Sequence, residues 1–309
     1  MDFLTDLDEI ISDKIGDINN KTGFNIQITD SEIPKRLQKL FNLKFKMISQ
    51  KVRNVHYSSE LRSKTLTEPY VSVLKEIEEK FKNGDDLNPY LSRHAFDPEF
   101  QDGLLNDWGI HHLHLNNRKD NEIDYLYSTS GCLLFVAVGE TDVYFLETRP
   151  HNESYRSSPE YPLWVRNEFL KIIKNNWNNL LKSSELDGFK PAEPMNRDDQ
   201  IVFRDNNVYT LAQIDDKVYL PFGGGITTSG VGGRQVEART GLLTDLSRDQ
   251  RYIENKTDEI KRIMREYGFE PNENLNFKLV DTPEGLVYLE QNIGFKFTLG
   301  PIKDILNVY

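Results

Sequence analysis

The stretch CLLFVAVGETDVYFLE, residues 132–147, decides the fold of this chain. Its first part, Cys132–Val138, is apolar on both faces of an extended backbone, which is typical of a central strand buried on both sides. A turn over 139–142 leads into a second strand, Val143–Glu147, and the two strands together predict a β-hairpin.

Segments on both sides of this hairpin predict an α+β fold. Ile110–Leu115 is apolar and rich in histidine, as expected of a further strand in a small antiparallel sheet. Residues 162–182 predict a helix whose apolar side chains, Trp164 and Phe169 among them, are directed inward and cover the sheet.

Polar and proline-containing stretches divide the chain into three segments. Residues 1–98 form a mainly helical N-terminal segment with a basic band, and residues 99–186 form the histidine-bearing α+β core. Residues 196–309 form a C-terminal α+β domain that opens with short strands at 201–204, 208–214 and 217–222.

Composition narrows the class of protein. The 309 residues carry a net charge of -11, which argues against a protein that coats nucleic acid. A single cysteine, Cys132, excludes an intrachain disulfide. No apolar run reaches the roughly 18–20 residues of a membrane span, and the N-terminus has no leader pattern, so we expect a cytoplasmic protein without a membrane partner.

A basic band interrupts this acidic background. Between Lys35 and Lys64 the chain has nine basic residues and one acid, Glu60. Such a band is typical of a restricted polyanion site, but an internally neutralised surface has the same composition. The residues expected to bind a substrate are Lys44, Lys46, Lys51 and Arg53 from the band, with Arg149 and Arg234 from elsewhere.

Four of the six histidines lie within 111–151 and form the candidate catalytic cluster. On a strand, His112 and His114 share one face, Arg118 follows the strand, and His151 comes after the hairpin. Histidine exchanges protons near neutral pH, and cations stabilise phosphorane charge, so this set suits RNA cleavage without a cofactor. The alternatives are a divalent metal ion bound by His112, His114 and His151, and a purely structural role.

The run from Gly109 to His151 resembles the core of RelE/HigB-type messenger-RNA interferase toxins. The matching pieces are the strand 110–115, Arg118, the apolar strand 133–138, the strand 143–146 and His151. The resemblance implies an RNase with phosphate-binding basic residues and general acid/base catalysis. This chain differs from the family in its length, its acidity and its extra histidines.

The glycine-rich loop 223–233, followed by Arg234, is a second candidate site. Backbone amides of such a loop can bind a phosphate, although Val231 stands where a Walker A sequence has lysine. The alternative interpretation is a loop without a ligand.

These patterns predict a nuclease, an RNA-cleaving toxin or host-defence effector that uses histidine acid/base chemistry. A second hypothesis is a non-catalytic sensor that binds a nucleotide or a regulatory protein through the glycine-rich loop. A third is a metal-dependent hydrolase with a His-x-His site.

Overall fold

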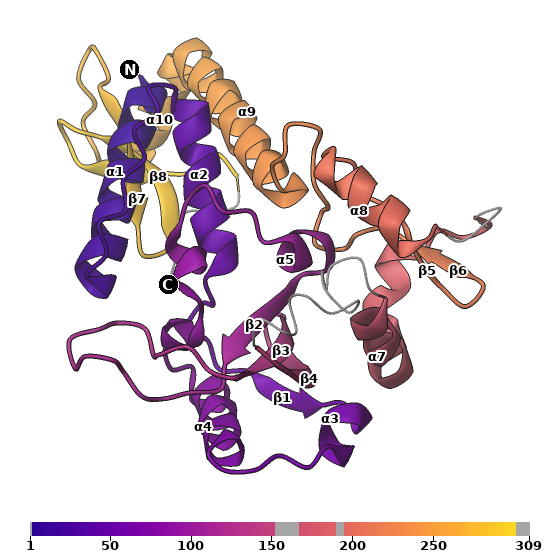
Figure 1. The fold of residues 1–309 in the computed structure, drawn as a ribbon. Helices are drawn as coiled ribbons and strands as arrows, with labels where there is room; N and C mark the ends of the chain where they lie inside the picture. Colours follow the sequence, from indigo (N-terminus) through magenta and orange to yellow (C-terminus); the bar gives the residue numbers. More distant parts are fainter. Residues whose placement is uncertain (1, 152–166, 190–194, 301–309) are drawn as a thin grey trace. The chain divides into compact units, whose positions relative to one another are not determined.

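The computed structural model describes residues 2–151, 167–189 and 195–300, and the fold is α+β (Figure 1). The chain forms two compact units. Unit 1 comprises Met1–Lys44 and Gln235–Val308, and unit 2 comprises Phe45–Arg234. This division differs from the three consecutive segments expected from the sequence, because unit 1 joins an N-terminal and a C-terminal stretch.

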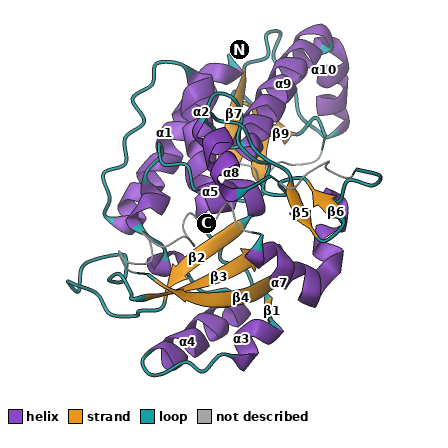
Figure 2. Ribbon diagram, turned by 45° about the vertical axis from the view of Figure 1, so that its right-hand side comes forward, coloured by secondary structure: helices purple, strands orange, loops and turns teal. Residues whose placement is uncertain are grey.

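Unit 2 is built on a four-stranded sheet with the order β1-β4-β3-β2 (Figure 2). The predicted central hairpin is confirmed as β3 and β4, and the strand before it as β2. β2, β3 and β4 are antiparallel, as expected, and β1 adds to β4 in parallel, so the four-stranded sheet is mixed. The strands are β1 (Asn54–Tyr57), β2 (Ile110–His114), β3 (Cys132–Val138) and β4 (Asp142–Pro150).

Helices pack on both faces of this sheet. Phe81 of α4 (Tyr70–Asn83) contacts Phe145 of β4, with ring centroids 5.8 Å apart. On the other face, Phe169 of α7 (Glu168–Trp177) contacts Phe135 of β3 at 4.6 Å. β3 is therefore buried on both sides, as its continuous apolar sequence predicts. The predicted covering helix is confirmed from residue 168, and its residues 162–166 lie outside the described part of the chain.

The remaining elements of unit 2 are short. α5 precedes β2, and α8 precedes a two-stranded hairpin of β5 and β6. Asn196 caps α8 by accepting a hydrogen bond from the Asp199 N–H at 2.9 Å. These elements are α3 (Ser59–Ser63), η1 (Asn88–Tyr90), η2 (Arg93–Phe96), α5 (Gly103–Trp108), η4 (Asn178–Ser184), α8 (Arg197–Asp205), β5 (Ala212–Ile214) and β6 (Lys217–Tyr219).

Unit 1 joins the N-terminal helix to a C-terminal antiparallel sheet of order β7-β8-β9. The Leu279 N–H of β7 donates to Asp6 Oδ2 of α1 at 2.8 Å, and Lys278 pairs with Glu9 at 2.7 Å. The elements are α1 (Phe3–Thr22), α2 (Ile33–Lys46), α9 (Gly233–Asn255), α10 (Thr257–Glu266), β7 (Phe277–Thr282), β8 (Gly285–Glu290) and β9 (Phe295–Phe297); α2 and α9 each run across the division between the units.

None of the helices in the described residues combines the length and the apolar character that crossing a membrane requires.

Candidate functional site

The structure brings His114 and His151 together but fixes His114 as a neutral group. Their ring centroids are 5.1 Å apart. The His114 side chain is buried, and its Nδ1 accepts a hydrogen bond from the Ser130 N–H at 3.2 Å. Burial, with smaller contributions from His112 and His151, lowers the pKa of His114 to about 3. An imidazole with this pKa is neutral at cellular pH and is poorly suited to donate a proton.

His112 lies on the same face of β2 and is partly exposed. Its Nδ1 is 3.6 Å from Oδ2 of Asp102. The other oxygen of Asp102 accepts a hydrogen bond from the Leu105 N–H at 3.0 Å and caps α5. The carboxylate thus links the start of α5 to β2, so the position of His112 has a structural explanation.

Arg118 and Arg149, the predicted arginines nearest in sequence to these histidines, do not complete a phosphate site with them. Arg149 is mostly buried and lies between two carboxylates, at 2.9 Å from Glu147 and 2.6 Å from Glu168. Its guanidinium also stacks on the Phe169 ring at 5.1 Å. Arg118 is exposed in the loop between β2 and β3, with no ion pair to a described residue. The positive charge of Arg149 is therefore neutralised within unit 2.

A metal site at these histidines has no support in the geometry. In residues 2–151, 167–189 and 195–300, no group of three or more histidine, cysteine, aspartate or glutamate side chains is arranged to hold a metal ion. Two of the three expected ligands, His114 and His151, direct their Nδ1 atoms to the backbone of Ser130 instead.

Two cations of the basic band are buried and bonded to backbone carbonyls, which gives no support to the expected role in substrate binding. Lys46 is buried, and its Nζ donates to the carbonyls of His94, Asp97 and Phe100. Burial lowers the pKa of its ammonium to about 8. Arg53 is also buried, and its guanidinium donates to backbone carbonyls that include Gly139 O at 2.7 Å. Both side chains hold loops in place and are shielded from solvent.

Most other cations of the band have acidic partners. Lys51 pairs with Glu140 at 2.6 Å and Lys64 with Glu147 at 3.3 Å. In unit 1, Lys39 pairs with Asp30 at 2.6 Å. Lys44 is half-buried in α2. These contacts favour the interpretation of an internally neutralised surface over a polyanion site.

The glycine-rich loop is packed against α5, and its backbone amides donate hydrogen bonds to acceptors within the protein. The Gly223 and Gly225 N–H groups donate to the carbonyls of Asp107 and Asn106, at 2.9 and 2.8 Å. In all, seven amides of the loop donate to acceptors in unit 2, those of residues 223, 224, 225, 227, 230, 232 and 233. A phosphate site needs free N–H groups, and most amides of this loop are already bonded within the protein, which favours the interpretation of a loop without a ligand. Arg234 after it stacks on the Phe45 ring at 4.6 Å.

Sequence reasoning missed a second histidine site on this sheet. His56 Nε2 of β1 lies 2.8 Å from Asp142 Oδ1 of β4, and both side chains are partly exposed. The His56 ring stacks on Tyr144 at 5.1 Å, and Tyr144 contacts Trp177 at 4.9 Å. A carboxylate that orients an imidazole is a common arrangement for proton transfer. No sequence motif links these residues, because the parallel pairing of β1 with β4 alone brings them together.

An exposed apolar surface around α8 and the β5–β6 hairpin was also missed. Among the described residues, fourteen large apolar side chains are strongly exposed, and eight of them fall between positions 189 and 220. They are Phe189, Met195, Val202, Phe203, Val208, Tyr209, Leu211 and Leu220. We call these eight residues the α8 surface. A concentration of this kind marks an interaction site on many soluble proteins.

Backbone hydrogen bonds bring together two pairs of residues within the α8 surface. The Val208 N–H donates to the Phe203 carbonyl at 2.9 Å, so the chain turns back beside the end of α8. Ala212 pairs with Tyr219 in the hairpin, and this register places Leu211 next to Leu220. Phe203 and Val208 are therefore neighbours in one part of the α8 surface, and Leu211 and Leu220 are neighbours in another.

The rim of the α8 surface is acidic. Six exposed aspartates accompany it, Asp187, Asp198, Asp199, Asp205, Asp215 and Asp216. Three cations nearby are paired with carboxylates, Arg204 with Asp107 at 2.6 Å, Lys217 with Glu185 at 2.5 Å and Lys174 with Asp215 at 2.5 Å. The Lys174 pair neutralises Asp215, and the other five aspartates carry the negative charge of the rim. The surface thus combines apolar side chains with negative charge.

Comparisons with protein-family models, with curated proteins and with solved structures found no match to this chain.

Proposed function

We propose that the protein is a non-catalytic binding protein, and that the α8 surface of unit 2 binds a protein partner. The exposure of eight large apolar side chains on one short stretch is the observation that supports this proposal. Val202 is 61% exposed although it lies on a helix of unit 2, where an apolar side chain is normally buried.

The charge around the surface indicates the kind of partner. Exposed aspartates attract lysine and arginine and disfavour acidic chains. The partner is therefore a segment with an apolar face flanked by basic residues, such as a basic amphipathic helix. The internal neutralisation of the basic band agrees with this choice, since it leaves little free positive charge for RNA.

A model peptide tests the proposal. A fluorescent helical peptide of leucine and lysine is titrated with the full-length protein, and anisotropy reports binding. The double variant Val202→Asp/Phe203→Asp is expected to bind at least about tenfold more weakly, because two apolar contacts are lost. The matched control is Ile123→Asp, since Ile123 is 94% exposed and lies outside the α8 surface.

Two outcomes would overturn the proposal. Equal affinity of the double variant and Ile123→Asp would mean that the peptide binds by net charge alone. A wild-type dimer that becomes monomeric in the double variant, measured by sedimentation, would show that the occupant is a second copy of the chain.

RNA cleavage remains a second candidate, supported by the partly exposed His56 that Asp142 orients beside Tyr144 and Trp177. Tyrosine and tryptophan rings can stack on bases. In this hypothesis the protein is a cytoplasmic toxin or host-defence effector. Purified protein is incubated with labelled single-stranded RNA, with and without EDTA.

Two variants then separate the histidine sites. If His56→Ala abolishes cleavage and the triple change of His112, His114 and His151 to alanine does not, the active site is the pair formed by His56 and Asp142. The opposite result would place catalysis at the predicted cluster, and no cleavage by the wild type would reject this candidate.

A further inference from the structure

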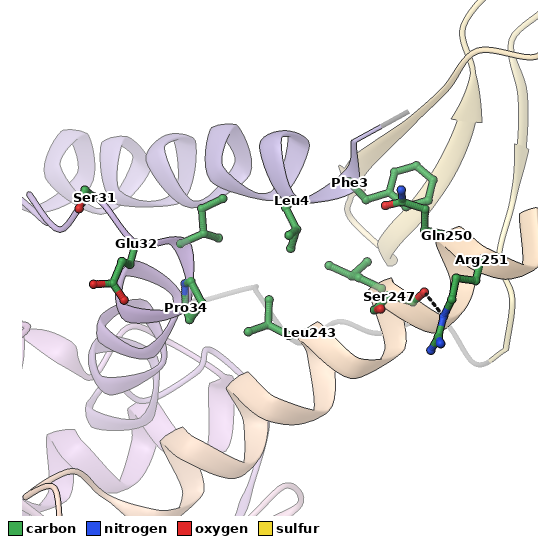
Figure 3. Close-up of a pocket in the computed structure, with 11 residues that line it drawn as sticks. Phe3, Leu4, Ser31, Glu32, Pro34, Leu243, Ser247, Gln250 and Arg251 are labelled. Atoms are coloured by element: carbon green, nitrogen blue, oxygen red, sulfur yellow. Dashed lines mark hydrogen bonds between the residues drawn. The ribbon is translucent and has the colours of Figure 1, made fainter. Parts of the chain in front are cut away.

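A cavity of about 510 Å³ lies within unit 1, between the first turn of α1, the start of α2 and the middle of α9 (Figure 3). Its volume is in the range of small-molecule sites. Six of its eleven lining residues are apolar, Phe3, Leu4, Ile33, Pro34, Leu243 and Leu246. The cavity therefore offers a mainly apolar wall to a ligand.

One end of the cavity is cationic. Arg251 of α9 lies there with Ser247, and its Nε donates to the Ser247 carbonyl at 3.2 Å. Among the described residues, no carboxylate forms an ion pair with Arg251, so its two NH₂ groups are available to a ligand. A guanidinium in this state binds carboxylate or sulfate groups through two parallel hydrogen bonds.

The acid at the opposite end does not cancel this charge. Glu32 is ion-paired with Lys35 at 2.7 Å. In Figure 3 its carboxylate points away from Leu4 and Leu243. The cavity thus has an apolar body and a single positive end.

We propose that this cavity binds one molecule of an anionic amphiphile, a medium-length aliphatic chain that ends in a carboxylate. The chain contacts the apolar wall formed by α1, α2 and α9, and the carboxylate accepts hydrogen bonds from the Arg251 guanidinium. This proposal concerns unit 1 and does not depend on the function proposed for unit 2.

Calorimetric titration of the full-length protein with decanoate and with decanol, both kept below micelle formation, tests both parts of the site. The wild type is expected to bind both, and decanoate more tightly. Arg251→Gln is expected to weaken decanoate at least about tenfold and to leave decanol unchanged, because the charged hydrogen bonds are lost. Arg251 is exposed, so this variant should fold normally.

A second variant and a control make the result specific. Leu4→Asn, also at an exposed lining position, is expected to weaken both ligands about equally. The control Arg262→Gln removes an arginine of α10 that is paired with Glu266, and should change neither affinity.

Three results would overturn the proposal. The first is an absence of decanoate binding by the wild type, and the second is equal affinity of Arg251→Gln and wild type for decanoate. The third is binding to vesicles with anionic headgroups that decanoate does not compete, which would identify a membrane surface as the ligand.

Discussion

Asp107 and Arg204 form an ion pair of 2.6 Å, and about nine-tenths of each side chain is buried. Asp107 lies in α5 and Arg204 in α8, so the pair fixes the helix of the α8 surface to the element before β2. The Asp107 carbonyl also accepts the Gly223 amide. One residue therefore holds both α8 and the glycine-rich loop.

We expect Arg204→Met to lower the free energy of unfolding of unit 2 by about 3–5 kcal/mol, since it leaves a buried carboxylate without its partner. All three tryptophans belong to unit 2, so tryptophan fluorescence in urea measures this stability. The double variant Asp107→Leu/Arg204→Met should recover most of the loss. An unchanged stability of Arg204→Met would show that the pair contributes nothing.

The buried His114 predicts a loss of stability in acid. Its folded-state pKa of about 3 lies below the unfolded value of 6.5, so the unfolded chain binds the proton more readily between these pH values. The contribution of His114 is complete above pH 6.5 and falls by about 1.4 kcal/mol per pH unit as the pH drops towards 3. His114→Asn keeps an oxygen for the Ser130 N–H and should reduce this slope in urea titrations at several pH values.

His94 supplies the comparison for this experiment, because its side chain is exposed. His94→Asn is the matched variant that removes an exposed histidine in place of the buried one. A slope that both substitutions reduce equally, or that neither reduces, would contradict the assignment to His114.

We predict that even the smallest side chain at Gly223 lowers the stability of the protein. A Cβ there would lie 2.5 Å from the carbonyl oxygens of Asn106 and Leu105. We expect Gly223→Ala to destabilise the protein by about 1–3 kcal/mol, measured as thermal unfolding by circular dichroism. Gly241 of α9 has open space around it, so Gly241→Ala should instead stabilise by about 0.5–1 kcal/mol. Equal effects of the two substitutions would argue against close packing of the loop.

The hydroxyl of Tyr219 is buried and has no hydrogen-bond partner among the described residues. Removing an unsatisfied hydroxyl removes its desolvation cost, so Tyr219→Phe should leave stability unchanged or raise it by about 1 kcal/mol. Tyr90→Phe should behave differently, because the Tyr90 hydroxyl donates to Glu76 at 2.7 Å. Fluorescence-detected urea unfolding of both variants distinguishes these cases, and a large loss for Tyr219→Phe would contradict the assignment.

Local sequence predicted the elements of the core well. The strands at Cys132 and Ile110 were confirmed. Burial on both faces of a strand leaves a continuous apolar run in the sequence, and partial burial leaves a mixed apolar and polar one, so both strands could be predicted. The strand expected at 201–204 is part of α8. Its apolar residues suggested a strand, but the capping by Asn196, with two acids in the first helical turn, favours a helix.

Long-range pairing explains most of what the sequence could not predict. His56 and Asp142 are 86 positions apart and meet only because β1 adds to β4 in parallel. Lys46 resembles a surface cation in sequence, but its three carbonyl partners lie some fifty residues further along the chain. The α8 surface gave no signal because six of its eight residues lie in segments that were expected to form short strands.

The joining of α1 to β7 has a consequence for the order in which the protein is made. During synthesis α1 leaves the ribosome first, yet Leu279 and Lys278, which hold it through Asp6 and Glu9, are made more than 250 residues later. Unit 2 is complete before that point, so it can fold while α1 still has no sheet to pack on. Nascent chains long enough to expose all of unit 2 outside the ribosome, but arrested before Phe277, should therefore contain a protease-resistant unit 2 and a protease-sensitive α1.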